Sequence, residues 1–296
     1  MKKKALFVIL IILFIYSPCL AKTDQFFLEY GSNLPPTFLG LESSRKVTQV
    51  FINPAGIYQN QMQSIKIDYA QALFGYTYLS FAYLLPLNNF SLGIGYQNFS
   101  SNDIPKTAVT EPGSRPEITG YLLDQQNKFD LNLAYAFTKN LYAGAGLHLY
   151  TENFANSILS QGLYSNLGLY CLLLENLQIG ASYSLPLRRI QKALSLSEKY
   201  TDIPYSWNFE AFYKFWCFQT GFVYQAINRT GFLELYLTDN FSFTVQNTWD
   251  KTWQNQNLSL GAIIDLNLIS LQYYYVIMFK EGIELSQNIF SVKFNF

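Results

Sequence analysis

The feature that most constrains this chain is a two-residue alternation of side-chain character along most of its length. In the segment 90–96 every second residue is Phe, Leu, Ile or Tyr, and the residues between them are Ser or Gly. The same alternation returns in segments 129–137, 177–185, 241–246 and 257–266. Because successive side chains of a strand point to opposite faces, these segments predict strands with one large apolar face and one small, polar face.

The nature of the two faces decides between a soluble sandwich and a membrane barrel. Only 14% of the residues are charged, whereas about 25% is usual for a soluble domain. A soluble sandwich would expose a charged face and bury a large apolar one. Here the small face, made of Ser, Gly, Gln, Asn and Thr, cannot fill a core, and it suits the lumen of a barrel whose apolar face meets lipid.

The connections between strands are alternately short and long, which favours a meander. Five short turns share an Asn followed by an aromatic residue or Leu, and we expect Asn to supply the left-handed backbone of a tight hairpin: Asn89, Asn140, Asn176, Asn240 and Asn267. The longer, polar connections are 101–127, 151–161, 188–204, 250–256 and 280–287. Transmembrane barrels have this asymmetry of short turns at one rim and longer loops at the other.

We predict about fourteen strands, each close to the ~9–11 residues that a tilted strand needs to cross a bilayer. They are 62–72, 75–86, 90–100, 128–138, 141–152, 162–174, 177–187, 205–214, 217–227, 230–238, 241–249, 256–266, 269–279 and 285–296. In hydrocarbon every backbone N–H and C=O must be paired, so the sheet must close. The predicted fold class is all-β, a closed antiparallel transmembrane barrel over residues 62–296.

Residues 1–21 have the composition of a cleaved signal peptide. Three lysines precede an uncharged apolar run, and small residues at 17–21 favour cleavage after Ala21. The alternatives are lipidation at Cys19 or an uncleaved anchor, although the apolar run is shorter than the ~20 residues of a spanning helix. We therefore expect export, to a bacterial outer membrane.

Charged residues follow the polar side of the alternation, so we expect them to line the lumen. A charge facing lipid costs a few kcal/mol, which by itself explains this placement. The formal net charge of zero offers no surface for nucleic acid. The polar residues predicted to face the lumen are Lys66, Asp68, Asp130, His148, Glu210, Lys214, Glu234, Asp265 and Lys293.

His148 is the only histidine, and it raises the alternative of a lipid-modifying barrel enzyme with a serine–histidine pair. No G-x-S-x-G motif, metal-ligand cluster or phosphate loop accompanies it. We predict no enzymatic activity, no catalytic residue, no cofactor and no metal.

Aromatic residues mark the expected membrane boundaries and the end of the chain. Trp207, Trp249, Trp253 and Trp216 fall near strand ends, where they favour an interfacial girdle over a platform for ligand stacking. The last strand is aromatic and ends on Phe. It resembles the signal that outer-membrane barrels present to their insertion machinery, and its residues are Phe290, Phe294 and Phe296.

Residues 22–61 lack strand periodicity and are too apolar for an idle tail, so we expect them to form a plug within or beneath the barrel. Its predicted residues include the basic pair Arg45 and Lys46 and the turn sequence Asn53-Pro54-Ala55-Gly56. In this turn Pro fixes φ, Gly permits positive φ and Asn caps the bend.

The turn sequence, its position before the first strand, the strand count and the terminal Phe together resemble the FadL superfamily, especially its PorV/PorQ-like branch. Residues 38–40, Phe-Leu-Gly, lie where that family has a related upstream motif. The resemblance implies a fourteen-stranded barrel with an N-terminal hatch. It also implies one of two roles: uptake of fatty acids or other hydrophobic compounds, or scaffolding in protein secretion.

Two features depart from the family. The glycine-rich stretch expected before Asn53 is replaced by 42–50, Glu-Ser-Ser-Arg-Lys-Val-Thr-Gln-Val, and the segment 101–127 is mostly polar. The leading functional prediction is binding or passage of a hydrophobic small molecule, and the alternative is a non-transporting PorV-like scaffold or shuttle in secretion or envelope organisation. The expected partners are membrane lipid, the insertion machinery, and a hydrophobic solute or a secretion partner.

Overall fold

The computed structural model describes residues 42–59, 62–71, 76–108, 115, 117–155, 157–191, 206–225, 228–250, 256–280 and 283–296. The predicted signal peptide and the first part of the predicted plug segment lie outside the described residues. Within them the chain forms two short helices and fourteen strands.

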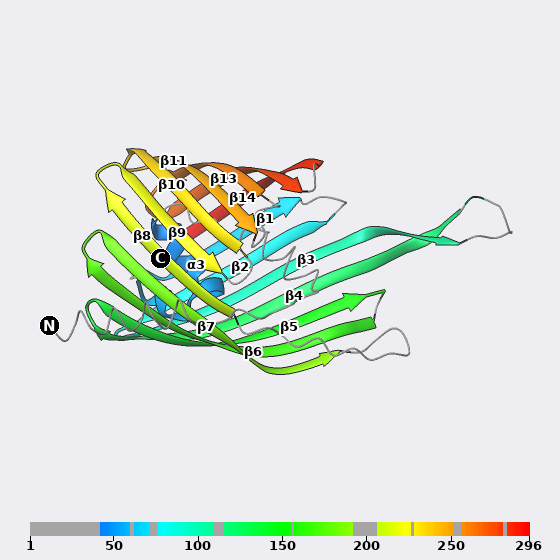
Figure 1. The fold of residues 1–296 in the computed structure, drawn as a ribbon, viewed down its shortest axis with the longest axis horizontal. Coiled ribbons are helices and arrows are strands. Elements are labelled where there is room, and N and C mark those ends of the chain that lie inside the picture. The colour runs from blue at the N-terminus through cyan, green and yellow to red at the C-terminus, as the bar shows by residue number, and fades with distance from the viewer. Residues whose placement is uncertain are drawn as a thin grey trace.

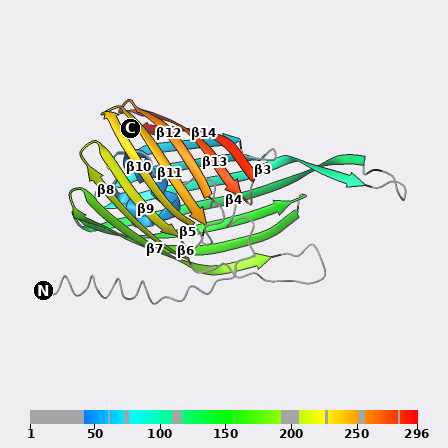
Figure 2. The same cartoon turned by 45° about the horizontal axis from the view of Figure 1, so that its top comes forward.

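The fourteen strands form one closed antiparallel barrel, in which each strand pairs with its neighbours in sequence and β1 pairs with β14. The predicted fold class and strand number are confirmed. The strands slant around the barrel, as Figure 1 and Figure 2 show. Their bounds are β1 Ser64–Gln71, β2 Thr77–Leu87, β3 Phe90–Ala108, β4 Glu117–Thr138, β5 Leu141–Phe154, β6 Ser157–Leu174, β7 Leu177–Gln191, β8 Ser206–Phe215, β9 Phe218–Gln225, β10 Asn228–Thr238, β11 Phe241–Asp250, β12 Gln256–Asp265, β13 Ile269–Lys280 and β14 Ile283–Asn295.

The seam between the first and last strands closes the barrel over the whole of β1. Eight residue pairs join β1 to β14, from Ser64 opposite Asn295 to Gln71 opposite Asn288. The last residue extends this closure, because the Phe296 amide donates to the Gln63 carbonyl at 2.9 Å. Closure leaves β1 and β14 with partners on both sides, as a barrel in hydrocarbon requires.

The outer and inner faces have opposite chemistry, which is the consequence of the alternation. On β4, Leu131 is 50% exposed on the outside, and its neighbour Asn132 is 1% exposed on the inside. The same contrast holds for Leu147 and His148 on β5. A belt of exposed leucine and aromatic side chains around a buried polar interior is the surface expected of a barrel that faces lipid.

Two expectations about the connections are wrong. Most of segment 101–127 is strand, because β3 and β4 continue as a paired hairpin well past the barrel rim (Figure 1). Similarly, β5, β6 and β7 extend into the segments 151–161 and 188–204. These polar residues can pair as strands because backbone hydrogen bonding outside the lipid does not require an apolar face.

The short turns also differ from the prediction. Of the five expected left-handed asparagines, only Asn267 has positive φ, at 66°; in the first turn the positive φ falls on Asn88. The backbone carbonyls of the other four accept hydrogen bonds from the neighbouring hairpin, as Asn89 does from the Ala136 amide at 3.0 Å. Trp216, 88% exposed, takes a positive φ of 55° in the β8–β9 turn.

The helices α3, Glu42–Ile52, and η1, Pro54–Gln59, lie inside the barrel (blue in Figure 1). The Tyr58 hydroxyl donates to the Asn88 carbonyl at 3.0 Å, which places η1 at the rim of the short turns. No helix among the described residues is long and apolar enough to span a membrane. We call residues 42–59 the plug.

Candidate functional site: the plug and its seat in the lumen

The sequence around Asn53 ends α3 and starts η1. The Asn53 amide donates to the Gln49 carbonyl at 3.0 Å, and Pro54, which has no amide hydrogen, cannot continue that pattern. The Asn53 side chain instead accepts from the Ala55 amide at 3.1 Å, and the Gly56 amide donates to the Asn53 carbonyl at 3.0 Å. The four-residue motif is therefore a tight bend capped by Asn53, as expected for a turn. Gly56, however, lies within η1 and does not take the positive φ that a glycine permits.

Glu210 on β8 holds the plug through both carboxylate oxygens. Its Oε1 accepts from Asn53 Nδ2 and its Oε2 accepts from Gln49 Nε2, each at 2.8 Å. Glu210 is 1% exposed. Hydrogen bonds to a buried carboxylate are stronger than neutral ones, so this pair is a strong polar contact between plug and wall.

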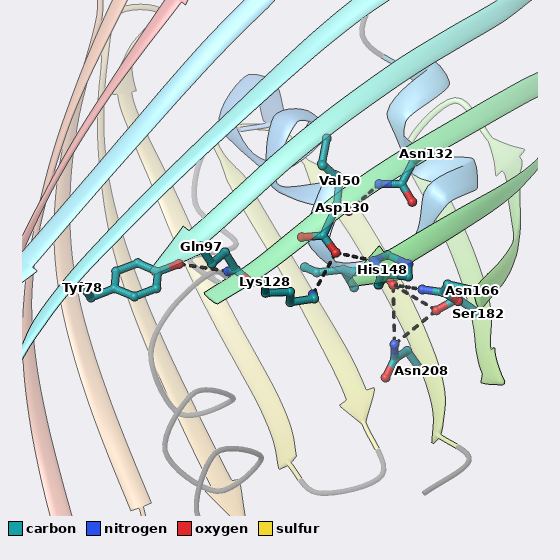
Figure 3. Close-up of polar contacts among 11 residues, drawn as sticks. Val50, Tyr78, Gln97, Lys128, Asp130, Asn132, His148, Asn166, Ser182 and Asn208 are labelled. Atoms are coloured by element: carbon teal, nitrogen blue, oxygen red, sulfur yellow. Dashed lines mark hydrogen bonds and ion pairs between the residues drawn. The ribbon is translucent and has the colours of Figure 1, made fainter. Parts of the chain in front are cut away.

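The carbonyls at the end of α3 are satisfied by side chains of the barrel wall. Val50 O accepts from Asn132 Nδ2 at 2.8 Å, and Ile52 O accepts from Ser182 Oγ at 3.0 Å and Asn166 Nδ2 at 3.2 Å. Figure 3 shows these three side chains, which come from β4, β6 and β7. The last carbonyls of a helix have no partner within it, so the wall supplies the cap.

Glycines in the wall let the plug backbone approach closely. A Cβ on Gly144 would lie 2.4 Å from Ala55 N, and one on Gly168 would lie 2.1 Å from Asn53 Oδ1. A Cβ on Gly180 would lie 2.4 Å from Glu210 Oε1. Three neighbouring strands, β5, β6 and β7, thus each contribute a glycine that the seat requires.

Apolar packing holds the two sides of the plug. One buried cluster joins plug and wall side chains from β2 and β4, and its members are Val47, Val50, Ile57, Ala82, Leu84 and Ala134. The second joins the plug to β5, β6, β8, β9 and β10, and its members are Ile52, Ala55, Tyr142, Tyr170, Phe212, Val223 and Phe232. Burial of these groups favours the seated position.

A charged group lies in the wall beside the plug (Figure 3). His148 Nδ1 is hydrogen-bonded to Asp130 Oδ1, the same oxygen that pairs with Lys128 Nζ at 3.1 Å. The imidazole stacks on Tyr164, with centroids 4.6 Å apart. His148 Nε2 has no hydrogen-bond partner, hydroxyl or other, among the described residues.

Most of the predicted lumen residues are buried inside the barrel: Lys66, Asp68, Asp130, His148, Glu210, Glu234 and Lys293. Lys66 Nζ pairs with Asp68 Oδ1 at 3.0 Å and donates to Thr48 Oγ1 of the plug at 3.4 Å. Lys214 lies exposed at the rim, with Nζ 5.2 Å from the Tyr236 ring centroid. Asp265 is half-buried near the last short turn.

The remaining predicted residues lie as follows. Arg45 and Lys46 fall within α3, and their side chains are outside the described part. Phe290 and Phe296 are exposed on the outer surface, and Phe294 is half-buried. Among the described residues no three His, Cys, Asp or Glu side chains lie together as metal ligands would.

The sequence interpretation missed an apolar row on the inner wall. Five inward residues are direct cross-strand neighbours through β3, β2, β1, β14 and β13, and we call them the lumen apolar row: Phe99, Tyr78, Ala70, Ile289 and Tyr274. Ile263 and Val276 extend it, and Tyr76 stacks on Phe99 with centroids 4.6 Å apart. The only signal in the sequence was the unbroken apolar run 273–278, where alternation fails.

The row lies on the long-loop side of the plug, since Tyr78 is near the start of β2 and the plug contacts the short-turn end. The tyrosine hydroxyls are engaged: Tyr78 accepts from Gln97 Nε2 at 3.0 Å, and Tyr76 donates to Asp124 Oδ2 at 2.7 Å. The row is therefore a buried cluster of rings and aliphatic groups on the inner side of the wall, and these two tyrosine hydroxyls are hydrogen-bonded.

Fold and site together define a class: a closed fourteen-stranded barrel with an apolar exterior and a plug seated in its lumen. No protein-family model matches the chain, and no curated protein matches it in sequence. Three solved structures share the fold at low identity. They are the CymD monoaromatic hydrocarbon channel (TM-score 0.61, 12% identity, 84% of this chain and 93% of that chain), the toluene transporter TodX of Pseudomonas putida (0.62, 11%, 84% and 94%) and a FadL homologue of Pseudomonas aeruginosa (0.56, 10%, 84% and 94%).

The fold is thus that of the FadL- and TodX-type barrels, which supports the broad part of the predicted resemblance. The finer assignment to the PorV/PorQ-like branch stays a prediction.

Proposed function

We propose that this protein is a bacterial outer-membrane channel for hydrophobic small molecules, in which the plug is the gate. The observation that carries the proposal is the lumen apolar row. The inner face of a transmembrane barrel is ordinarily polar, and a row of rings and aliphatic side chains across five strands has no role in meeting lipid.

The chemistry of the row favours an uncharged, apolar solute. Its hydroxyls are already bonded within the protein, and carboxylates lie beside it, as Asp124 does on Tyr76. Aromatic rings offer stacking and edge contacts to another ring. The structural neighbours CymD and TodX are described as a channel for monoaromatic hydrocarbons and a transporter for toluene, and the same solute class is proposed here.

Passage requires the plug to move, because its side chains pack against both sides of the lumen. The contacts between plug and wall are a few specific hydrogen bonds and two small apolar clusters. No covalent bond in these contacts would have to break for the plug to move. The predicted scaffold role in secretion remains the alternative, and no contact among the described residues favours it over passage.

Uptake by cells that lack their own transporter tests the proposal. Radiolabelled toluene and a labelled long-chain fatty acid would be compared in cells expressing the protein in the outer membrane. We expect faster toluene uptake than in cells without the protein. Equal uptake with and without the protein, for both solutes, would exclude a channel and favour the scaffold.

A matched pair of variants ties uptake to the row. Tyr274→Ser removes an inward ring from the row, and Tyr275→Ser removes the adjacent outward ring. We expect Tyr274→Ser to lower uptake severalfold and Tyr275→Ser to leave it unchanged. The shift in gel mobility on heating in detergent would check that both barrels are folded.

A further inference from the structure

The charged group beside the plug has a feature that the proposed gate does not explain. His148 is 1% exposed, and Asp130, which accepts its Nδ1–H, is 2% exposed. Since the carboxylate accepts, Nδ1 carries the proton of the neutral ring, and Nε2 is a bare acceptor. Nε2 and Asn132 Oδ1 are both buried without a hydrogen-bond partner among the described residues.

These two orphaned atoms lie close to each other, over Gly146. A Cβ on Gly146 would be 2.9 Å from His148 Nε2 and 2.0 Å from Asn132 Oδ1. Asn132 also contacts the plug directly, because its Nδ2 donates a hydrogen bond to Val50 O at 2.8 Å. Asn132 thus lies beside the imidazole of His148 and also donates to the helix of the plug.

We propose that His148 is a proton-operated positioning residue that releases the plug on acidification. This inference rests on the proposed gate. One proton from water adds to Nε2 and gives an imidazolium whose second N–H has no acceptor. Two unpartnered acceptors lie in this group: Asp130 Oδ2, whose carboxylate already faces Nδ1, and Asn132 Oδ1, which lies with Nε2 over Gly146. Rotation of the Asn132 amide toward Nε2 moves its Nδ2 away from Val50 O.

The charge balance acts in the same direction. The charged and titratable groups that face the ring are Lys128 and Asp130 from β4 and Tyr164 from β6. The plug faces this group with Phe51, whose centroid is 5.9 Å from Lys128 Nζ. With the plug seated, a new imidazolium would share one carboxylate oxygen with Lys128 in a dry site, which is costly.

When the plug leaves, the face that Val50 and Phe51 cover is open to water, which can solvate the imidazolium. The displaced state therefore binds the proton more tightly than the seated state. By linkage, acid then favours displacement of the plug. The largest change in the equilibrium constant for displacement equals the ratio of the proton affinities of His148 in the displaced and seated states.

Two measurements on the same full-length protein test this link. The chain has one histidine, so untagged protein with ¹⁵N,¹³C-labelled histidine gives a single imidazole to titrate by NMR in nanodiscs. Plug displacement is followed with Val47→Cys, a fully buried plug position, in a background of Cys19→Ser, Cys171→Ser and Cys217→Ser. The rate at which a water-soluble maleimide labels this thiol reports how often the plug leaves.

We expect the labelling rate to rise about tenfold on acidification, which corresponds to one pH unit of difference in proton affinity between the two states. The midpoint should coincide with the imidazole titration. His148→Phe keeps a ring to stack on Tyr164 and should remove the acid response. Thr244→Val, at a buried wall position on β11, should retain it.

Each contrary outcome overturns the inference. It is wrong if the imidazole titrates while the labelling rate stays constant, or if His148→Phe responds to acid as the parent protein does. Uptake distinguishes this failure from that of the proposed function. Acid-dependent labelling without any solute uptake would refute the channel but support the proton link. Solute uptake with labelling that does not depend on acid would support the channel but refute the proton link.

Discussion

Asn53 of the plug and Glu210 of β8, 157 residues apart in the chain, share a hydrogen bond of 2.8 Å inside the barrel. The bond joins the turn motif that precedes the first strand to a buried carboxylate in the eighth. Gln49 occupies the other carboxylate oxygen. One acidic side chain therefore fixes two amides of the plug, one at the end of α3 and one at the bend.

Replacing this carboxylate should loosen the gate. Glu210→Gln turns one acceptor into an N–H that faces another amide, so we expect the seated plug to lose ~1–3 kcal/mol. Maleimide labelling of Val47→Cys should become correspondingly faster. Glu234→Gln is the control, because Glu234 on β10 is equally buried but accepts from Ser242 of β11 at 2.6 Å. Equal acceleration in both variants would count against a specific role of Glu210.

A methyl group on the glycine seat should displace the plug without unfolding the barrel. In Gly144→Ala the new Cβ would lie 2.4 Å from backbone atoms of the plug, so the bend would have to move to make room for it. We expect faster labelling of Val47→Cys and higher solute uptake, with normal heat-modifiability. Gly231→Ala, whose Cβ would be 3.6 Å from Trp249, should behave as the parent protein does; if it does not, the close approach at Gly144 is not the cause.

Replacing an exposed leucine by a charged residue should cost more folding free energy the nearer the leucine lies to the middle of the bilayer. Leu131 lies along the length of β4, and Leu237 lies beside the β10–β11 turn. We expect Leu131→Lys to cost ~2–4 kcal/mol and Leu237→Lys ~0–1 kcal/mol of folding free energy in lipid vesicles. Urea unfolding in the vesicles measures both, and similar costs would show that the outer surface does not face hydrocarbon.

The terminal aromatic strand should direct assembly. Phe296 is exposed after the closing strand, so its side chain contributes little to packing. We expect Phe296→Ala to lower the amount of assembled barrel in cells while leaving the stability of refolded protein unchanged. Phe218→Ala, at another exposed aromatic position on the same rim, is the control. Normal assembly of Phe296→Ala would remove the insertion-signal assignment.

The sequence predicted the barrel because alternation is a local property. Within each strand the alternation shows which residues face outward and which face inward, as for Leu131 and Asn132. All fourteen strands were predicted, but β3 ends eight residues later and β4 begins eleven residues earlier than expected. The expectation failed where the backbone leaves that constraint. The hairpin of β3 and β4 extends beyond the rim with polar residues, and only Asn267 of the five turn asparagines takes the left-handed conformation.

By itself, then, the sequence determined the barrel, its apolar exterior and the bend at Asn53, since these depend on residues adjacent in the chain. Only the tertiary structure decided that Asn53 meets Glu210, that His148 and Asn132 lie over Gly146, and that Phe99, Tyr78, Ala70, Ile289 and Tyr274 form one row. Those contacts depend on closure and strand register, which bring distant residues to the same height in the lumen. The two-residue alternation shows whether a side chain points outward or inward. The register between strands then decides which other side chains it contacts.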